Sequence, residues 1–376
     1  MSSKEFTLLL YTLWLCGFFP VDHPLEQGAV KAPSKKGLTI RRSLILVWSL
    51  VLIVYPLLFV FDIAFNAQAV PAAETGRLSA LIPSGIIIVS QFLINTILRL
   101  FSIINSGKLV KLVGMLRELS VTSEQVDMSA DRQKWKPYYI IWLVYAGIFL
   151  TLTYKLVKDF ATAEHDLKGS KFLFMPESDA VRIIAMQFVF ITTAFPPCFL
   201  FHFVVSAGSQ LIHTHGSICT ELCDFLAAGP VIMMVKNIKT IEASGGIARI
   251  KALRLQERFS RLKECFKMYE HFAGIFAFCI MWWIFVVMIL FCSSITSDGV
   301  KRMDLISYGV GSAAFTYVVA SFGEHIASSI DHGREDISDA LGRLRREPKF
   351  FEDEGNADMV SNLLSATSVN ICILRI

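Results

Sequence analysis

Long apolar stretches alternate with polar segments along the chain, and this pattern predicts membrane-spanning helices. A helix that crosses the hydrocarbon core needs about 20 consecutive apolar residues, because no water is present there to satisfy backbone polar groups. The segments that meet this requirement are 43–63, 81–103, 138–157, 183–205, 272–294 and 306–326. The pattern therefore predicts an all-α, polytopic membrane helix bundle with six spans.

A shorter apolar stretch, 6–19, precedes the first of these segments. It is too short to span, so we predict a helix that lies at the interface or re-enters the membrane. A signal-peptide core is the alternative, but only Lys4 precedes the stretch, and Pro20 and Pro24 stand where small residues of a cleavage site would be expected.

Two polar segments contain apolar positions at helical spacing. The first runs without Gly or Pro from Ile247 into the fifth predicted span, so we expect one long helix over 247–294 whose first half projects into the cytoplasm. The second continues the sixth predicted span beyond Ile326. Two apolar stripes of this kind either pack together or form a subunit interface, and a helix on the lipid headgroups is the alternative. The candidate interface residues are Leu255, Phe259, Leu262, Phe266, Ile337 and Leu341.

Lys and Arg in the connecting segments predict the orientation. The segments on the N-terminal side of the membrane carry 27 of them and the opposite segments carry 7. Because cytoplasmic loops are rich in Lys and Arg, the N-terminus is placed in the cytoplasm, and six spans return the C-terminus to the same side. The expected parts are a cytoplasmic segment 1–42, a bundle 43–326 that includes the cytoplasmic loop 206–271, and a cytoplasmic tail 327–376.

Composition supports a membrane protein and excludes other classes. The chain is 54% hydrophobic and 18% charged, with a mean hydropathy of +0.54. Its net charge of +4 is small and its basic residues are dispersed, which disfavours nucleic-acid binding. No Walker, GxSxG, HExxH or dinucleotide-binding motif occurs, so we expect neither an enzyme nor a cofactor.

The cysteines sit mostly in apolar stretches, and we expect no disulfide. One pattern, His213-x-His215-x3-Cys219-x3-Cys223, contains residue types that bind zinc. Ligands one turn apart on a single helix rarely complete a tetrahedron, so ordinary packing is the preferred interpretation and no metal is predicted.

Polar residues inside spans are costly and therefore informative. Gln91 and Asn95 lie one turn apart, which predicts that their face of the second span looks into the bundle. Arg99 is expected to snorkel from the inner end of the same span, without a functional role. Pro196–Pro197 should kink the fourth span and free carbonyls that need other partners, as often happens beside a cavity.

The outer halves of the predicted spans combine aromatic and hydrogen-bonding side chains that suit a small polar or amphiphilic ligand. For any single one of them, an interface anchor or a lipid-facing side chain is the alternative. The candidate ligand-binding residues are Gln91, Thr151, Tyr154, Gln187, Trp283 and Tyr308.

The arrangement resembles the insect-type gustatory receptors, a family of arthropod chemoreceptors related to insect odorant receptors. The resemblance rests on LLLYTLWLCGFFP near the N-terminus, SGKLVKLVGMLREL after the second span, RFSRLKECFKMYEHFAGIFAFCIM into the fifth, and ASSIDHGREDISDALGRL after the sixth. It covers roughly 6–345.

This resemblance implies a plasma-membrane subunit with seven spans and a cytoplasmic N-terminus. It also implies a homo- or hetero-tetramer with related subunits, joined by cytoplasmic helices, in which a small-molecule tastant opens a cation pore lined by the seventh helix. The family's TYhhhhhQF motif is missing here, and the tail after Asp358 is short and polar. We therefore expect a truncated or alternatively spliced product that lacks the pore helix.

A six-span transporter or a non-conducting membrane scaffold is the rival hypothesis. Many carriers are built from inverted halves with interrupted helices at matching positions. Pro196–Pro197 in the fourth span has only Pro56 opposite it in the first, so the two halves do not correspond.

Overall fold

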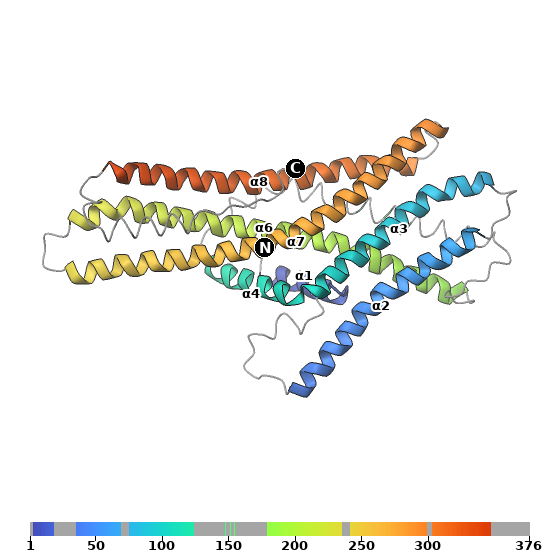
Figure 1. Cartoon of the computed structure of the whole chain (residues 1–376), viewed down its shortest axis with the longest axis horizontal. Coiled ribbons are helices and arrows are strands. Elements are labelled where there is room, and N and C mark those ends of the chain that lie inside the picture. Colours follow the sequence, from blue (N-terminus) through green and yellow to red (C-terminus); the bar gives the residue numbers. More distant parts are fainter. Residues whose placement is uncertain are drawn as a thin grey trace. The chain divides into compact units, whose positions relative to one another are not determined.

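The computed structural model describes residues 3–18, 35–68, 75–123, 147, 151, 154, 179–234, 241–298 and 303–346. Every element in these ranges is an α-helix, and none of the described residues forms a strand. The prediction of an all-α fold is confirmed for this part of the chain. The helices, shown in Figure 1, are α1 (Ser3–Leu15), α2 (Lys35–Gln68), α3 (Thr75–Ile104), α4 (Ser106–Ser123), α6 (Asp179–Met234), α7 (Ile241–Asp298) and α8 (Met303–Arg345).

The long helices extend well past the apolar segments that predict them. Helix α7 includes the whole of 247–294, which confirms one continuous helix through the amphipathic stretch and the fifth apolar segment. Helix α8 likewise continues from the sixth segment to Arg345. The third predicted segment, 138–157, lies outside the described residues apart from positions 147, 151 and 154.

By length and composition, one helix in the described ranges could cross a membrane: Ile250–Cys292, within α7. The pair Val89–Ile104 and Ser106–Leu116 passes the same criterion together, with a bend of 79° at Asn105. These helices give weak support for membrane association. Six spans remain a prediction.

The chain divides into two compact units. Unit 1 comprises Met1–Val110, Ser129–Phe203 and Ile275–Val319, and unit 2 comprises Lys111–Met128, Val204–Gly274 and Ala320–Ile376. Sequence reasoning placed 206–271 with the membrane bundle, whereas contacts group it with the chain after Ala320. The boundaries in α6 and α7 fall within three residues of predicted span ends at 205 and 272.

Unit 1 has apolar side chains outside and several polar ones inside. On α2, Trp48 and Val54 are 42% and 49% exposed, and on α7 Phe278 is 69% exposed. Among the described residues of unit 1, the buried polar side chains are Ser49, Asp62, Gln91, Asn95, Arg99, Ser102, Thr192 and Thr193.

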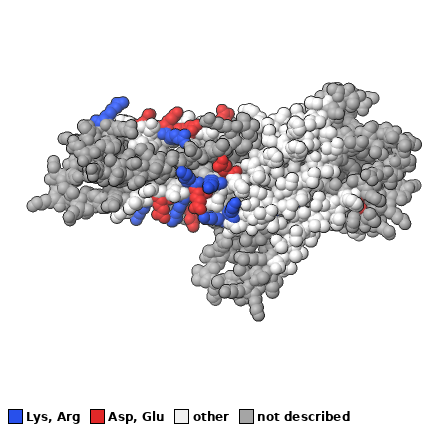
Figure 2. Space-filling model, viewed as in Figure 1, with Lys and Arg blue, Asp and Glu red and all other residues white. Residues whose placement is uncertain are grey.

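Unit 2 has the opposite distribution. Its interior is lined by apolar side chains of α6, α7 and α8, among them Leu222, Phe259 and Ile337. On the face shown in Figure 2, charged side chains gather over the described part of unit 2, whereas the described part of unit 1 is nearly free of them. Burial of the apolar stripes therefore stabilises unit 2 as it does a water-soluble helical bundle.

Candidate functional site

A row of polar side chains runs along one face of α3 in unit 1. Gln91, Asn95 and Arg99 follow each other at intervals of four residues, so they share a face of the helix, and their side chains are 6%, 1% and 1% exposed. The prediction that Gln91 and Asn95 face inward is confirmed. The prediction for Arg99 was wrong, because this side chain does not snorkel to water but is buried.

Three prolines on neighbouring helices explain what this polar face contacts. Proline lacks the N–H that would bond to the carbonyl four residues earlier in a helix. Pro56 in α2 thereby frees the carbonyl of Leu52, and Pro196 and Pro197 in α6 free those of Thr192 and Thr193. Left unpaired inside an apolar bundle, each of these carbonyls would be strongly destabilising.

Each freed carbonyl accepts a hydrogen bond from α3. Arg99 donates from Nη1 to Leu52 O at 2.5 Å and from Nη2 to Thr192 O. Asn95 donates from Nδ2 to Thr193 O at 2.9 Å, and Gln91 Nε2 lies 3.5 Å from the same oxygen. The expectation that the carbonyls freed at Pro196–Pro197 need other partners is confirmed, and the same applies at Pro56.

Arg99 also contacts the end of α1. This helix ends in a Schellman motif, in which Phe18 N donates to Leu13 O and Gly17 N to Trp14 O, both at 3.0 Å, with Gly17 at a φ of 77°. The turn leaves Cys16 O free to accept from Arg99 Nε at 3.2 Å. The guanidinium lies 5.4 Å from the centre of the Phe18 ring, a cation–π distance.

The electrostatics of this cluster are those of a cation held by carbonyl dipoles. The C-terminal end of α1 carries partial negative charge, which favours a guanidinium there. In the described residues, the hydrogen bonds of Arg99 go to backbone oxygens of three helices or helix ends, at Cys16, Leu52 and Thr192. Arginine suits this role because its planar group carries five N–H donors in fixed directions. We call Arg99, Asn95 and Gln91 with their carbonyl partners the proline-carbonyl cluster.

Sequence reasoning missed this cluster, although a signal was present. It weighed Arg99 only by its distance from a span end, and it treated the prolines apart from the donors. The sequence contains three donor side chains on one helix face, at 91, 95 and 99. It also contains three helix prolines, each of which frees one carbonyl acceptor, so the donors equal the freed acceptors in number. Which donor meets which freed carbonyl depends on contacts between residues 47 to 102 positions apart.

The predicted ligand-binding residues all belong to unit 1. Gln91 and Trp283 are buried, whereas Thr151 and Tyr154 are exposed. Helices α6 and α8 contain Gln187 and Tyr308, whose side chains lie outside the described part of the structure. A pocket shared by these six residues stays a prediction, and the proline-carbonyl cluster contains only Gln91 of the set.

The predicted interface residues lie inside unit 2. Leu255, Phe259, Leu262 and Phe266 are at most 1% exposed, and Ile337 is 5% exposed. Leu341 is half-buried. Of the alternatives left by the sequence, packing of the two stripes within the chain is the one that this burial supports.

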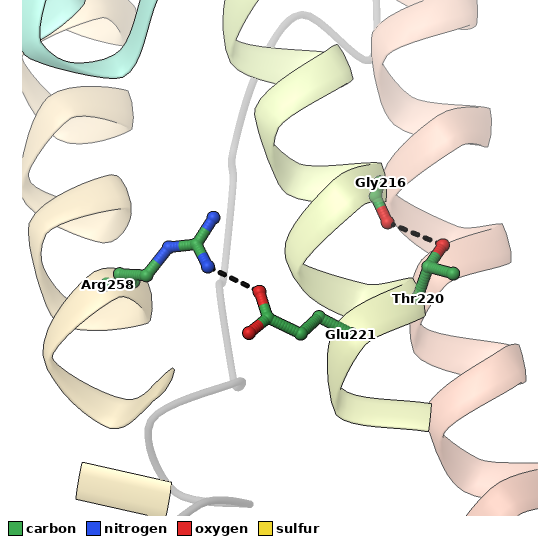
Figure 3. Close-up of polar contacts among 4 residues, drawn as sticks. All are labelled: Gly216, Thr220, Glu221 and Arg258. Carbon is green, nitrogen blue, oxygen red and sulfur yellow. Dashed lines mark hydrogen bonds and ion pairs between the residues drawn. The ribbon is translucent and has the colours of Figure 1, made fainter. Parts of the chain in front are cut away.

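Ion pairs join the helices on the surface of unit 2. Arg258 of α7 pairs with Glu221 of α6, one residue after Thr220, whose hydroxyl donates to Gly216 O at 3.0 Å (Figure 3). Lys111 of α4 pairs with Glu264 of α7. These side chains are at least one-third exposed, so each pair contributes less than about 1 kcal/mol and mainly favours one register of the helices.

His215 lies in the interior of unit 2, against α8. Its ring is edge-on to Phe259 and Phe266, with centroids 6.5 and 6.4 Å away, and Cys219 Sγ lies 3.6 Å from Nε2. A Cβ on Gly333 would lie 2.7 Å from His215 Cε1, so only glycine fits there. Burial lowers the pKa of His215 to about 4, and the positive charge of Arg334 contributes to this shift.

The described residues contain no group of three or more His, Cys, Asp or Glu side chains placed to hold a metal ion. His215 and Cys219 of the zinc-like pattern contact each other in a packed interior. This environment suits the packing interpretation of the pattern.

Comparisons of the chain with protein-family models, curated protein sequences and solved structures find no match.

Proposed function

We propose that the chain is a multi-pass chemoreceptor subunit of the plasma membrane, similar to insect gustatory receptors, with a cytoplasmic N-terminus. A small amphiphilic tastant is its ligand, and related receptor subunits complete a tetrameric, ligand-gated cation channel. The single observation that carries the membrane part is the inverted polarity of unit 1, which exposes apolar side chains and buries Asn95 and Arg99.

This inverted distribution of polar and apolar side chains is the one expected for a unit that is surrounded by lipid. In water, exposed side chains such as Phe278, Trp282 and Phe285 would favour aggregation, whereas acyl chains solvate them without penalty. Pairing of buried polar groups with proline-freed carbonyls is also typical of membrane proteins. Prolines are tolerated within membrane helices because neighbouring helices supply donors to the freed carbonyls.

The receptor part is supported by the sequence arrangement and by unit 2. Long helices that leave an apolar unit and pack into a charged bundle resemble the cytoplasmic helices that join subunits in gustatory receptors. In unit 2, α4, α6, α7 and α8 provide such a bundle. Because its apolar stripes are already covered within the chain, we propose that subunits meet through other surfaces.

Topology is tested by placing an epitope tag at each end of the full chain in intact cells. Both tags should bind antibody only after the plasma membrane is permeabilised. A control tag at 74, between the first two predicted spans, should bind without permeabilisation. An accessible N-terminal tag in intact cells would contradict the proposed orientation.

Receptor activity is tested by recording currents from cells that express the chain, alone and with a related receptor subunit. In cells that also express the related subunit, a panel of sugars and bitter compounds should include at least one that evokes a cation current. Substrate uptake into proteoliposomes without any ligand-evoked current would instead favour a transporter. Gln91 is a predicted ligand contact, whereas Asn95, one helical turn away, is not. Gln91→Leu should therefore shift the ligand concentration that evokes half of the maximal current, and the matched variant Asn95→Leu should not.

A further inference from the structure

The contacts of Arg99 join three backbone segments that are distant in sequence. Its three nitrogens donate to Cys16 O at the end of α1, to Leu52 O of α2 and to Thr192 O of α6. The last two are carbonyls freed by Pro56 and Pro196. We propose that α1 is a strap seated beside the proline sites of α2 and α6 in unit 1, and that Arg99 is the positioning residue that couples its seating to both sites.

The end of α1 packs directly on α2, one helical turn before Pro56. A Cβ on Gly17 would lie 3.0 Å from Leu52 Cδ1 and 3.4 Å from Ser49 Oγ, so the α1 turn touches the helical turn whose carbonyl Pro56 frees. Trp48 of the same helix donates from Nε1 to Leu15 O at 2.9 Å. Leu10 and Leu13 complete the seat as fully buried side chains.

Coupling follows from the rigidity of the guanidinium. The N–H directions of this planar group are fixed relative to one another, so the three carbonyls must be placed together. If Leu52 O or Thr192 O moves, Arg99 must shift, and its bond to Cys16 O and its contact with the Phe18 ring change as well. The carbonyls freed in α2 and α6 are thereby linked to the position of α1.

The neighbouring proline supplies a matched control. Thr193 O, freed by Pro197, accepts from Asn95 rather than from Arg99. Pro196 and Pro197 are adjacent in α6, but only Pro196 frees a carbonyl that Arg99 holds. The proposal therefore predicts that two adjacent, chemically identical substitutions differ in their effect on α1.

Cys16 reports the seating of α1. The full chain, purified in detergent, is exposed to a maleimide and the modified cysteines are identified by peptide mass spectrometry. Cys292, which is exposed on α7, is the internal reference. Arg99→Met should raise the modification rate of Cys16 on the order of tenfold, the least expected for loss of a hydrogen bond from a charged donor. The rate at Cys292 should not change.

The decisive comparison uses Pro196→Ala and Pro197→Ala. The first substitution restores an N–H that competes with Arg99 for Thr192 O, so Cys16 should react faster. The second acts on Thr193 O and should leave the reactivity of Cys16 as in the parent chain. Arg99→Lys keeps the charge but cannot reach three carbonyls at once, and it should behave like Arg99→Met.

These variants also cover the case in which Arg99→Met does not fold. The proline variants remove no buried donor and restore a helix hydrogen bond, so they should still elute as folded protein in size-exclusion chromatography. Equal modification of Cys16 in Pro196→Ala and Pro197→Ala would overturn the proposal. Protection of Cys16 in Arg99→Lys would also overturn it, by showing that charge alone seats α1.

Discussion

Units 1 and 2 share the long helices α6, α7 and α8 but differ in which side chains these helices bury and expose. On α7, Phe259 is fully buried in unit 2 and Phe278 is 69% exposed in unit 1, although both belong to one continuous helix. Unit 2 buries apolar side chains and exposes charge, whereas unit 1 exposes apolar side chains and buries Arg99. A single helix can serve both arrangements because helical hydrogen bonding is independent of the solvent, while the position of each side-chain type is not.

The largest expected effect comes from removing one aromatic ring in each unit. Phe259→Ala should lower the free energy of unfolding by about 3–5 kcal/mol, because it leaves a cavity in a packed interior. Phe278→Ala, on the same helix, removes an exposed ring and should change stability little. Thermal unfolding in one detergent measures both. A comparable loss in the two variants would contradict the difference between the units.

Charge placed on α7 tests the solvent of each unit. Phe285 and Leu253 are 56% and 57% exposed, in unit 1 and unit 2 respectively. Phe285→Arg should disfavour membrane insertion by about 2.5–3.5 kcal/mol, the value for arginine at a span centre. Leu253→Arg should insert as the parent chain does. The fraction of each variant that resists carbonate extraction from membranes is the measurement, and equal fractions would count against lipid around unit 1.

Packing inside unit 2 is tested at Gly208. A Cβ there would lie 2.5 Å from Tyr269 Oη and 2.7 Å from Phe322 Cζ, and both rings are buried. Gly208→Ala should destabilise the protein by about 1–3 kcal/mol through overpacking. Gly216→Ala on the same helix meets nothing within 4 Å. This control should be neutral or slightly stabilising, because alanine favours helix more than glycine does.

A pH dependence specific to unit 2 is expected at His215. The pKa of His215 is about 4 in the folded chain and near 6.5 when unfolded. Above pH 6.5 both states are neutral. As pH falls from 6.5 to 4, the unfolded state binds the proton first, so stability falls by at most about 1.4 kcal/mol per pH unit. His215→Asn should remove this part of the slope in unfolding curves recorded between pH 7 and 4.

Much of the helical architecture could be predicted because apolar periodicity and length report on helices directly. The continuity of α7 and α8 followed from stripes that contain Phe259 and Ile337 and run without breaks into apolar segments. The sequence of the apolar stripes did not reveal what covers them. The same apolar residues are needed whether a stripe packs within its own chain or against another subunit. Their burial inside unit 2 answers that question for Leu255 and Phe259.

The site was harder to predict because its acceptors are backbone atoms. Gln91 and Asn95 could be assigned to an inward face from their spacing, but the role of Arg99 depends on where Leu52 and Thr192 lie in space. No side-chain pattern marks a free carbonyl except the proline four residues later. Sequence reasoning identified Pro196–Pro197 as a source of free carbonyls but did not pair those acceptors with the donors at 95 and 99, and it did not treat Pro56 in the same way.

The burial of Arg99 has a consequence for biosynthesis. Thr192 is translated 93 residues after Arg99, an interval of about 5–20 s at ribosomal elongation rates. Leu52 and Cys16 already exist when Arg99 leaves the ribosome, but the α6 carbonyl does not. The nascent α3 therefore carries an incompletely paired guanidinium until α6 is made. For the membrane location that we propose, this predicts that α3 stays beside the insertion machinery until α6 supplies the missing acceptor.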